Sequence, residues 1–449
     1  MAIDDKWYGF VHKQIPIYPL ITFRILFGLV TLISTLRFLL LGWVEEQYIT
    51  PILHFTYYGL DWAKPLPGML MYIPFTIMLL CSVNIILGAF YKISAFIFFI
   101  SFTYVELIDV TYYLNHYYFV SIISFWMIFV PAHRYLSIDS VCNRKIIITY
   151  TSAWTINILK FHLCIVYFFA GIAKINTDWL LNAMPLSIWL PAKNYMPVIG
   201  FTFDYKITAY LFSWVGMLFD IFISYLLIYR HTTVWAWVVL CMFHIITGYL
   251  FQIGVFPLVM SACTLIFFDN NIHKNVINTL GKICNYHAPA LTKYYAPTMG
   301  HHHKLFAYLI GIYVIFQLLL PMRYLLYPGN IFWTEEGYRF AWRVMLMEKA
   351  GTVAFYVTDS QTGKRGEVVN SDFLNAHQEK QMAFQPDMIL QFAHYLHKYY
   401  RAKGVNDPLV NCHAYVTLNG RPSRLYIDTT INLAKKQDSW QPKSWILPF

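Results

Sequence analysis

The sequence predicts a mainly α-helical membrane protein, in which a polytopic bundle of about nine spanning helices precedes a small extramembrane α+β domain with β-hairpins. Of the 449 residues, 58% are hydrophobic and only 12% are charged, about half the charged share of a soluble domain. The charge is also uneven: residues 328–449 contain 25 Asp, Glu, Lys and Arg side chains, about 20% of that stretch, whereas residues 1–327 contain 31, about 9%. We therefore predict a transmembrane domain over 1–327 and a water-facing domain over 328–449.

Nine apolar segments approach the length that the hydrocarbon core of a bilayer requires, about 20 residues for a helix. They are 16–42, 68–91, 93–113, 115–131, 154–176, 207–229, 233–250, 252–268 and 304–327. Very few residues separate the third segment from the fourth and the seventh from the eighth, so these two boundaries are the least sharply defined.

The basic residues predict the orientation of the bundle. Nine spans place the two termini on opposite sides of the membrane. With the N-terminus inside, the inner segments carry eleven lysines and arginines and the outer loops carry three. Because cytoplasmic loops are enriched in Lys and Arg, we expect a cytoplasmic N-terminus and a periplasmic or lumenal C-terminal domain.

Three segments define the predicted α+β domain. Residues 351–369 alternate around a Gly-containing turn and predict a hairpin. Residues 386–404 begin with proline, have apolar spacings of three and four, and end at glycine, which predicts a helix. Residues 413–428 predict a second hairpin around Asn419-Gly420.

Composition and motifs argue against several functional classes. The net charge of +10 does not indicate a nucleic-acid partner, because the basic residues are dispersed between apolar runs. The sequence contains no HExxH, P-loop or GxSxG motif, so the common zinc, nucleotide and serine-hydrolase sites lack support. The histidine triplet 301–303 has no Asp, Glu or Cys near it in the sequence, and we predict no metal site.

Ionisable side chains within the apolar segments are candidates for function, because a charge in the membrane core costs several kcal/mol. They are Arg24, Arg37, Glu106, Asp109, His116, Lys160, Lys174, Asp220 and His244. With the topology above, five of them converge on the outer face, beneath the C-terminal domain: Glu106, Asp109, His116, Lys174 and His244.

Structural roles compete with functional ones at several of these positions. Lys160 fits a lysine that extends its ammonium group to the inner boundary. Arg24 and Arg37 could pair with Asp220 or with lipid phosphates. Asp109 precedes TYYLNH and could cap the next helix.

Lys174 is the strongest catalytic candidate. It follows nine uncharged and mostly apolar residues, and such surroundings disfavour the ammonium form of a lysine. A neutral lysine is a competent general base. The competing interpretation, a lysine reaching the outer interface, is equally compatible with the spacing.

Four stretches in order carry a resemblance to a known family: DVTYYLNHYY (109–118), IVYFFAGIAKINTDW (165–179), FHIITGYLFQIGVFPLVM (243–260) and WTEEGYRFAWRVM (333–345). YVTLNGRPSRLYID (415–428) through SWILPF (444–449) follows the same order. Nearly the whole chain thus resembles the vitamin K-dependent gamma-glutamyl carboxylases and their bacterial relatives with a horizontally transferred transmembrane (HTTM) domain. Some members have two adjacent lysines where this chain has Ala173 and Lys174.

The resemblance implies an activity, its cofactor and its site residues. Lys174 would deprotonate reduced vitamin K, the hydroquinone of phylloquinone or menaquinone, and His116 would serve the carboxylation. Dioxygen and carbon dioxide would be co-substrates, and the products would be vitamin K epoxide and γ-carboxyglutamate in a glutamate-containing protein or peptide. Tyr338 would lie beside the quinone, and Asn115, Asp109 and His244 would shape or polarise the site.

This reading agrees with the chemistry of the reaction. A glutamate γ-C–H is too weak an acid for any side-chain base, so a cofactor must carry that step. An apolar quinone suits a membrane-buried pocket, and the exclusion of water protects a carbanion. Two alternatives remain: a quinol oxygenase that does not carboxylate a peptide, and a non-enzymatic quinone-binding or transport protein.

Overall fold

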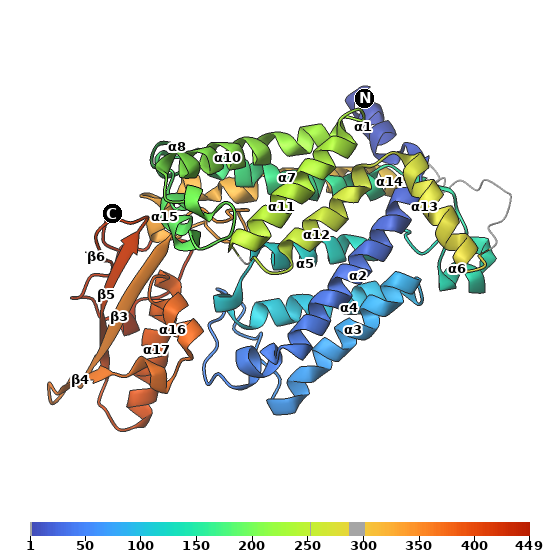
Figure 1. Ribbon diagram of the computed structural model, residues 1–449. Helices are drawn as coiled ribbons and strands as arrows, with labels where there is room; N and C mark the ends of the chain where they lie inside the picture. Colours follow the sequence, from blue (N-terminus) through green and yellow to red (C-terminus); the bar gives the residue numbers. More distant parts are fainter. Residues whose placement is uncertain (1, 252, 287–300) are drawn as a thin grey trace.

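The computed structural model describes residues 2–251, 253–286 and 301–449, and it consists of a long helical bundle with a small α+β domain at one end (Figure 1). Seven of the described helices are long and apolar enough to cross a membrane. They are α2 (Tyr18–Leu40), α3 (Tyr72–Leu87, preceded by the 3-10 turn Gly68–Met71), α4 (Tyr91–Ile108), α7 (Trp154–Ala173), α10 (Lys206–Ile228), α11 (Thr233–Phe251) and α14 (His301–Leu319, continued by the 3-10 turns Leu320–Leu326).

The two other predicted spans are shorter helices inside the same bundle. The predicted segment 115–131 is α5 (Asn115–Phe129), and 252–268 is α12 (Phe256–Cys263) followed by the 3-10 turn Thr264–Phe267. Helix α5 extends over only about 22 Å at 1.5 Å per residue. The prediction of about nine membrane helices is thus consistent with seven long helices and two short ones.

The outer surface of the bundle is apolar. Large hydrophobic side chains are exposed along α10, α11 and α14, including Ile207, Trp235 and Ile312, each of them more than 60% exposed. Such a surface is stable only in contact with lipid. The protein is therefore an integral membrane protein.

The C-terminal domain confirms both predicted hairpins and the predicted helix. Its antiparallel sheet has the order β4-β3-β5-β6, formed by β3 (Lys349–Thr358), β4 (Arg365–Val368), β5 (Leu409–Leu418) and β6 (Arg424–Leu425). The turn between β5 and β6 contains Asn419 and Gly420, both with positive φ, as the Asn-Gly pair predicts. Helix α17 (Pro386–Ala402) and a helix not foreseen, α16 (Ala376–Met382), cover the face turned toward the bundle (Figure 1).

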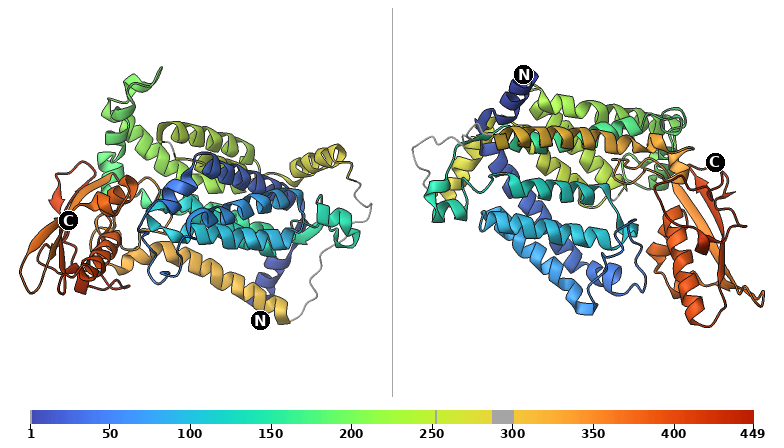
Figure 2. Two further views of the ribbon diagram at one scale, coloured as in Figure 1. Left: turned by 90° about the horizontal axis from the view of Figure 1, so that it is seen from below. Right: turned by 180° about the vertical axis from the view of Figure 1, so that it is seen from behind.

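The end of the bundle opposite the C-terminal domain carries the other extramembrane elements. Helix α1 (Ala2–His12) packs against the start of α14, where the Trp7 indole nitrogen donates to the Ala307 carbonyl at 3.0 Å. A two-stranded sheet, β1 (Gln14–Pro16) with β2 (Tyr150–Ser152), joins the starts of α2 and α7. Helices α6 (Ile138–Cys142) and α13 (Asn270–Ile283) lie at this end, far from the C-terminal domain (Figure 2).

Candidate active site

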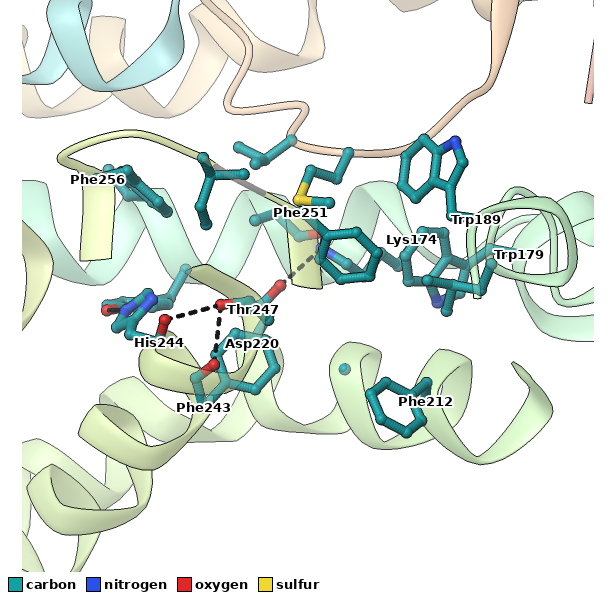
Figure 3. A pocket seen from close by; sticks show the side chains of 18 residues that line it. Lys174, Trp179, Trp189, Phe212, Asp220, Phe243, His244, Thr247, Phe251 and Phe256 are labelled. Atoms are coloured by element: carbon teal, nitrogen blue, oxygen red, sulfur yellow. Dashed lines mark hydrogen bonds and ion pairs between the residues drawn. The ribbon is translucent and has the colours of Figure 1, made fainter. Parts of the chain in front are cut away.

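A cavity lies between α7, α10 and α11, and Figure 3 shows the side chains that line it. It is at the end of the bundle that faces the C-terminal domain (Figure 1). Its volume is about 730 Å³ when the open space at its mouth is counted. Most of its wall is apolar and aromatic. The polar side chains in it are Tyr167, Lys174, Asp220, His244 and Thr247.

Lys174 and Asp220 form an ion pair in the wall of this cavity. Lys174 caps the C-terminus of α7 and is 6% exposed, and its Nζ donates to Asp220 Oδ2 at 2.7 Å and to the Ala170 carbonyl at 3.2 Å. Asp220 is also buried, on α10. The pair therefore holds a proton between two groups that are both shielded from water.

Gly171 explains why the pair forms. A methyl group on Gly171 would lie 2.7 Å from Ile221 Cγ1 and 2.8 Å from the Ile221 backbone nitrogen. Only a residue without a side chain lets α10 approach α7 this closely, and Asp220 is the neighbour of Ile221. The glycine in the AGIAK sequence thus sets the distance between the lysine and the carboxylate.

A second buried polar pair lines the same cavity. The Tyr167 hydroxyl and His244 Nε2 are 2.7 Å apart, and both residues are nearly fully buried. Within the described residues, His244 Nδ1 is buried and has no hydrogen-bond partner. Because buried polar groups are normally satisfied, this nitrogen is available to a ligand polar group.

The roof of the cavity comes from the chain segment that connects the bundle to the C-terminal domain. Val344 and Met345 of this segment line the cavity. Phe340, Trp342 and Met345 all have φ between 54° and 59°, a left-handed conformation that is strained for large side chains. Such strain persists only where surrounding contacts hold it.

Asn115 and Trp189 supply contacts that hold this roof. Asn115 Nδ2 donates to the Arg343 carbonyl at 2.8 Å, and its Oδ1 accepts from the Tyr113 hydroxyl at 3.0 Å. On the other side, the Trp189 indole nitrogen donates to Glu348 Oε2 at 2.5 Å. Of the predicted site residues, Asn115 therefore binds the backbone of the roof and does not line the cavity.

His116 lies next to the cavity but does not line it. It is buried at the start of α5, and its ring centroid is 5.7 Å from that of Phe256. The Phe256 ring lines the cavity, and its centroid is also 5.6 Å from the centroid of the His244 ring. One phenyl ring thus contacts both predicted histidines.

The structure places the remaining predicted residues elsewhere. Asp109 caps the 3-10 turn Val110–Tyr112 by accepting from the Thr111 amide, and it also accepts from Gln378 Nε2 of α16 at 2.9 Å. Tyr338 lines a separate cavity of about 1170 Å³ beside the C-terminal domain. Glu106 accepts from the Ser121 hydroxyl at 2.5 Å, between α4 and α5.

The alternative pairing of Arg24 or Arg37 with Asp220 is wrong, since Asp220 binds Lys174. Arg24 instead donates to the carbonyls of Ala132 and Leu136 at 2.9 and 2.6 Å, and the Arg37 guanidinium stacks on Trp43 at 4.5 Å. Among the residues whose side chains are described, no three His, Cys, Asp or Glu are grouped to hold a metal ion. The side chains of 301–303 lie outside that part of the chain.

Asp178 joins the active-site end of the bundle to the C-terminal domain. It lies on α8 (Thr177–Asn182), just after Lys174, and accepts from both terminal nitrogens of Arg421, at 2.5 and 2.8 Å, and from Asn419 Nδ2 at 2.8 Å. Partial burial raises the pKa of the carboxyl, but the hydrogen bonds from Arg421 and Asn419 outweigh it and leave the pKa below its ordinary value of 3.8.

This contact predicts acid-triggered undocking of the C-terminal domain. A carboxyl whose pKa is lowered in the folded state stabilises the contact above the unfolded pKa and loses that effect as the pH falls through the lowered value. We expect docking to persist to below pH 3.8 and then weaken, as measured by hydrogen exchange at residues 419–421. Asp178→Asn should weaken docking at pH values above the lowered pKa and abolish the transition, and an unchanged transition in that variant would contradict the assignment.

Two family models match the chain. The HTTM domain matches residues 12–271, and the lumenal domain of vitamin K-dependent gamma-carboxylase matches residues 302–449. No solved structure matches significantly. The first match covers the helices that form the cavity walls, and the second covers the roof segment and the sheet domain. Because the two models match in order and together span most of its length, the chain belongs to the gamma-glutamyl carboxylase family, with an HTTM domain followed by the family's lumenal domain.

Proposed function

We propose that the protein is a membrane-bound peptidyl-glutamate γ-carboxylase that couples the oxygenation of reduced vitamin K to the carboxylation of a glutamate side chain. The observation that carries the proposal is the buried Lys174–Asp220 pair in the wall of a largely apolar cavity. Family membership supports a vitamin K-dependent, carboxylase-like membrane protein.

The cavity suits a reduced naphthoquinone. Trp179, Trp189 and Phe243 offer aromatic faces to a planar ring system, and the apolar remainder suits an isoprenoid tail. A quinol also carries two hydroxyl groups. Lys174 is placed to meet one of them, and the unpartnered Nδ1 of His244 gives a polar contact for the ring or its other hydroxyl.

Lys174 and Asp220 act as one base. The pair is neutral overall whether the proton lies on nitrogen or oxygen, so it is tolerated in the apolar wall. With the shared proton on Asp220 across the 2.7 Å hydrogen bond, neutral Lys174 takes a proton from a hydroxyl in the cavity. The pair then carries one positive charge, which offsets the anion left on the deprotonated hydroxyl.

The cofactor carries the step that no side chain can. With dioxygen, a bound reduced vitamin K would supply a base strong enough to remove the γ-proton of glutamate. The roof residues Val344 and Met345 exclude water from that chemistry. His116, beyond the Phe256 ring, assists the addition of carbon dioxide, and the peptide arrives from the side of the C-terminal domain, which we place in the periplasm or lumen.

Purified protein tests the proposal directly. Reduced vitamin K, labelled bicarbonate and a glutamate-rich peptide should together yield vitamin K epoxide and acid-stable label in the peptide. Omission of the quinol should abolish both products. If neither epoxide nor labelled peptide forms, the enzyme reading fails.

A quinol oxygenase without peptide carboxylation is the second candidate. The observation in its favour is that Phe256 separates His116 from the cavity, so the quinol half of the reaction needs no residue beyond the cavity wall. Epoxide formation with no label fixed in any glutamate peptide would favour this candidate.

His116→Ala distinguishes the two halves of the reaction in the same assay. For a carboxylase, the variant should lose at least about 10²-fold in fixed label while it keeps most of its epoxide formation, since general acid–base groups contribute at least this much. Phe256→Leu is the matched control, because it changes the wall between the histidines without removing a titratable group. If His116→Ala lost epoxide formation and fixed label to the same extent, His116 would not act specifically in carboxylation.

A further inference from the structure

A second cavity lies at the opposite end of α7 from Lys174. It encloses about 950 Å³, including its open mouth, and is lined by Asn157 and Lys160 of α7, Arg230 and Thr233 of the α10–α11 turn, and Asp269 and Asn270 at the start of α13. Lys160 precedes Lys174 by about 21 Å along the helix axis, at 1.5 Å per residue. The two cavities share no lining residue and face opposite ends of the bundle.

The charge in this cavity is unbalanced. Within the described residues, no carboxylate lies within ion-pair distance of Lys160, whose Nζ instead lies 5.2 Å from the centre of the Phe267 ring. Arg230 pairs with Asp269 at 3.1 Å, but its side chain is 77% exposed. Asp269 is the sole carboxylate in the lining and is also engaged in capping α13 through the Asn271 amide at 2.9 Å. The lining therefore contains two cationic side chains, Lys160 and Arg230, and one carboxylate, which already has hydrogen-bond partners.

Three helix starts strengthen the positive potential. The first turns of α7, α11 and α13 contribute Asn157, Thr233 and Asn270 to the lining, and each of these helices has at least fourteen residues. A helix N-terminus carries a partial positive charge. Together with Lys160 and Arg230, these ends favour an anion.

The surroundings place the cavity at a membrane interface. The adjoining helix α13 exposes Ile272, Val276 and Ile283 on one side and carries Lys274 and Lys282, the pattern of a helix that lies in the plane of the interface. Besides its charged and polar groups, the cavity wall contains apolar side chains such as Ile228, Val234 and Phe268. A ligand with an anionic head and an apolar body matches both parts.

We propose that this cavity binds the phosphate headgroup of one anionic phospholipid. Lys160 and Arg230 hold the phosphate, the partial positive charge at the starts of α7 and α11 adds to its attraction, and the acyl chains leave along the apolar wall between Ile228 and Val234. This site is independent of the quinol chemistry at Lys174 and anchors the opposite end of the bundle to its leaflet.

Native mass spectrometry of the detergent-purified full chain tests the proposal, with phosphatidylglycerol and phosphatidylcholine of identical acyl chains as probes. Wild-type protein should retain one phosphatidylglycerol in preference to phosphatidylcholine. Lys160→Gln should weaken that retention by at least about five-fold, the effect of one basic side chain near an anionic lipid, and Lys160→Arg should restore it. Lys92→Gln is the matched control, since Lys92 is an exposed lysine in the first turn of α4 at the same end of the bundle.

Two results would overturn the proposal. Equal retention of phosphatidylglycerol by wild-type protein and Lys160→Gln would remove Lys160 from any lipid site. Displacement of the lipid by inorganic phosphate at an equal concentration would show that the cavity takes a free anion and not a lipid headgroup.

Discussion

Lys174→Met is expected to lower the rate of vitamin K epoxide formation by about 10²- to 10⁴-fold, the contribution of a positioned general base. The methionine keeps most of the side-chain volume in the cavity wall, so quinol binding should change much less than turnover. The measurement is chromatographic quantification of epoxide from reduced vitamin K under dioxygen, with the affinity for the quinol determined separately. An epoxide yield equal to that of the wild type would remove Lys174 from the mechanism.

The Lys174 experiment needs a control for folding. Removal of the lysine leaves Asp220 buried without its partner, and an uncompensated buried charge costs about 3–5 kcal/mol. Lys174→Met combined with Asp220→Asn removes that charge and should recover stability without recovering activity. Lys193→Met changes a half-buried lysine in the 3-10 turn Pro191–Lys193, outside the cavity lining, and should leave both properties unchanged.

Lys349→Met is expected to destabilise the C-terminal domain by about 3–5 kcal/mol, the cost of removing one partner of a buried ion pair. The ammonium group, with a side chain only 1% exposed, donates to Glu335 Oε1 at 2.8 Å, the Trp333 carbonyl at 2.7 Å and the Tyr426 hydroxyl at 3.3 Å. Burial lowers the pKa of Lys349, and the carboxylate of Glu335 opposes that shift. The lysine thus ties the segment that enters the domain to the start of its central strand.

Hydrogen exchange in β3 and β5 measures this effect, because the two strands pair over ten residues. Protection factors there should fall with the loss of stability. Lys364→Met, in the exposed turn before β4, is the matched control and should leave exchange unchanged. The double variant Lys349→Met with Glu335→Gln should recover part of the loss. Exchange in Lys349→Met equal to that in Lys364→Met would show that the pair contributes nothing.

The sequence was most informative where structure depends on neighbours in the chain. Apolar length located the seven long helices and the two shorter helices of the bundle, and the Asn419-Gly420 pair located a hairpin, because helix length and turn chemistry are local properties. The pairing of β3 with β5 was not foreseen, since about sixty residues separate the strands and the alternation within each strand does not specify its partner.

The same limit applies to the site. Lys174 and His244 stood out because polar side chains are costly in apolar segments, and both line the cavity. Their partners did not stand out: Asp220 is 46 residues from Lys174, and Tyr167 is 77 residues from His244 and resembles any other aromatic residue of the bundle. Gly171 offered the one local signal for the close approach of α7 and α10. The roles proposed for all six predicted site residues, Lys174, His116, Asn115, Asp109, His244 and Tyr338, remain predictions.

The strained roof couples the binding of a ligand in the cavity to the binding of a peptide at the C-terminal domain. Met345 contacts the cavity while Glu348, three residues later, precedes the central strand and binds Trp189 of the cavity wall. A peptide that binds the C-terminal domain and shifts this segment changes the affinity of the cavity for its ligand by some factor. Linkage then requires that an occupied cavity change the affinity for the peptide by the same factor. The order in which two substrates arrive would therefore alter the rates of assembly but not the stability of the assembled complex.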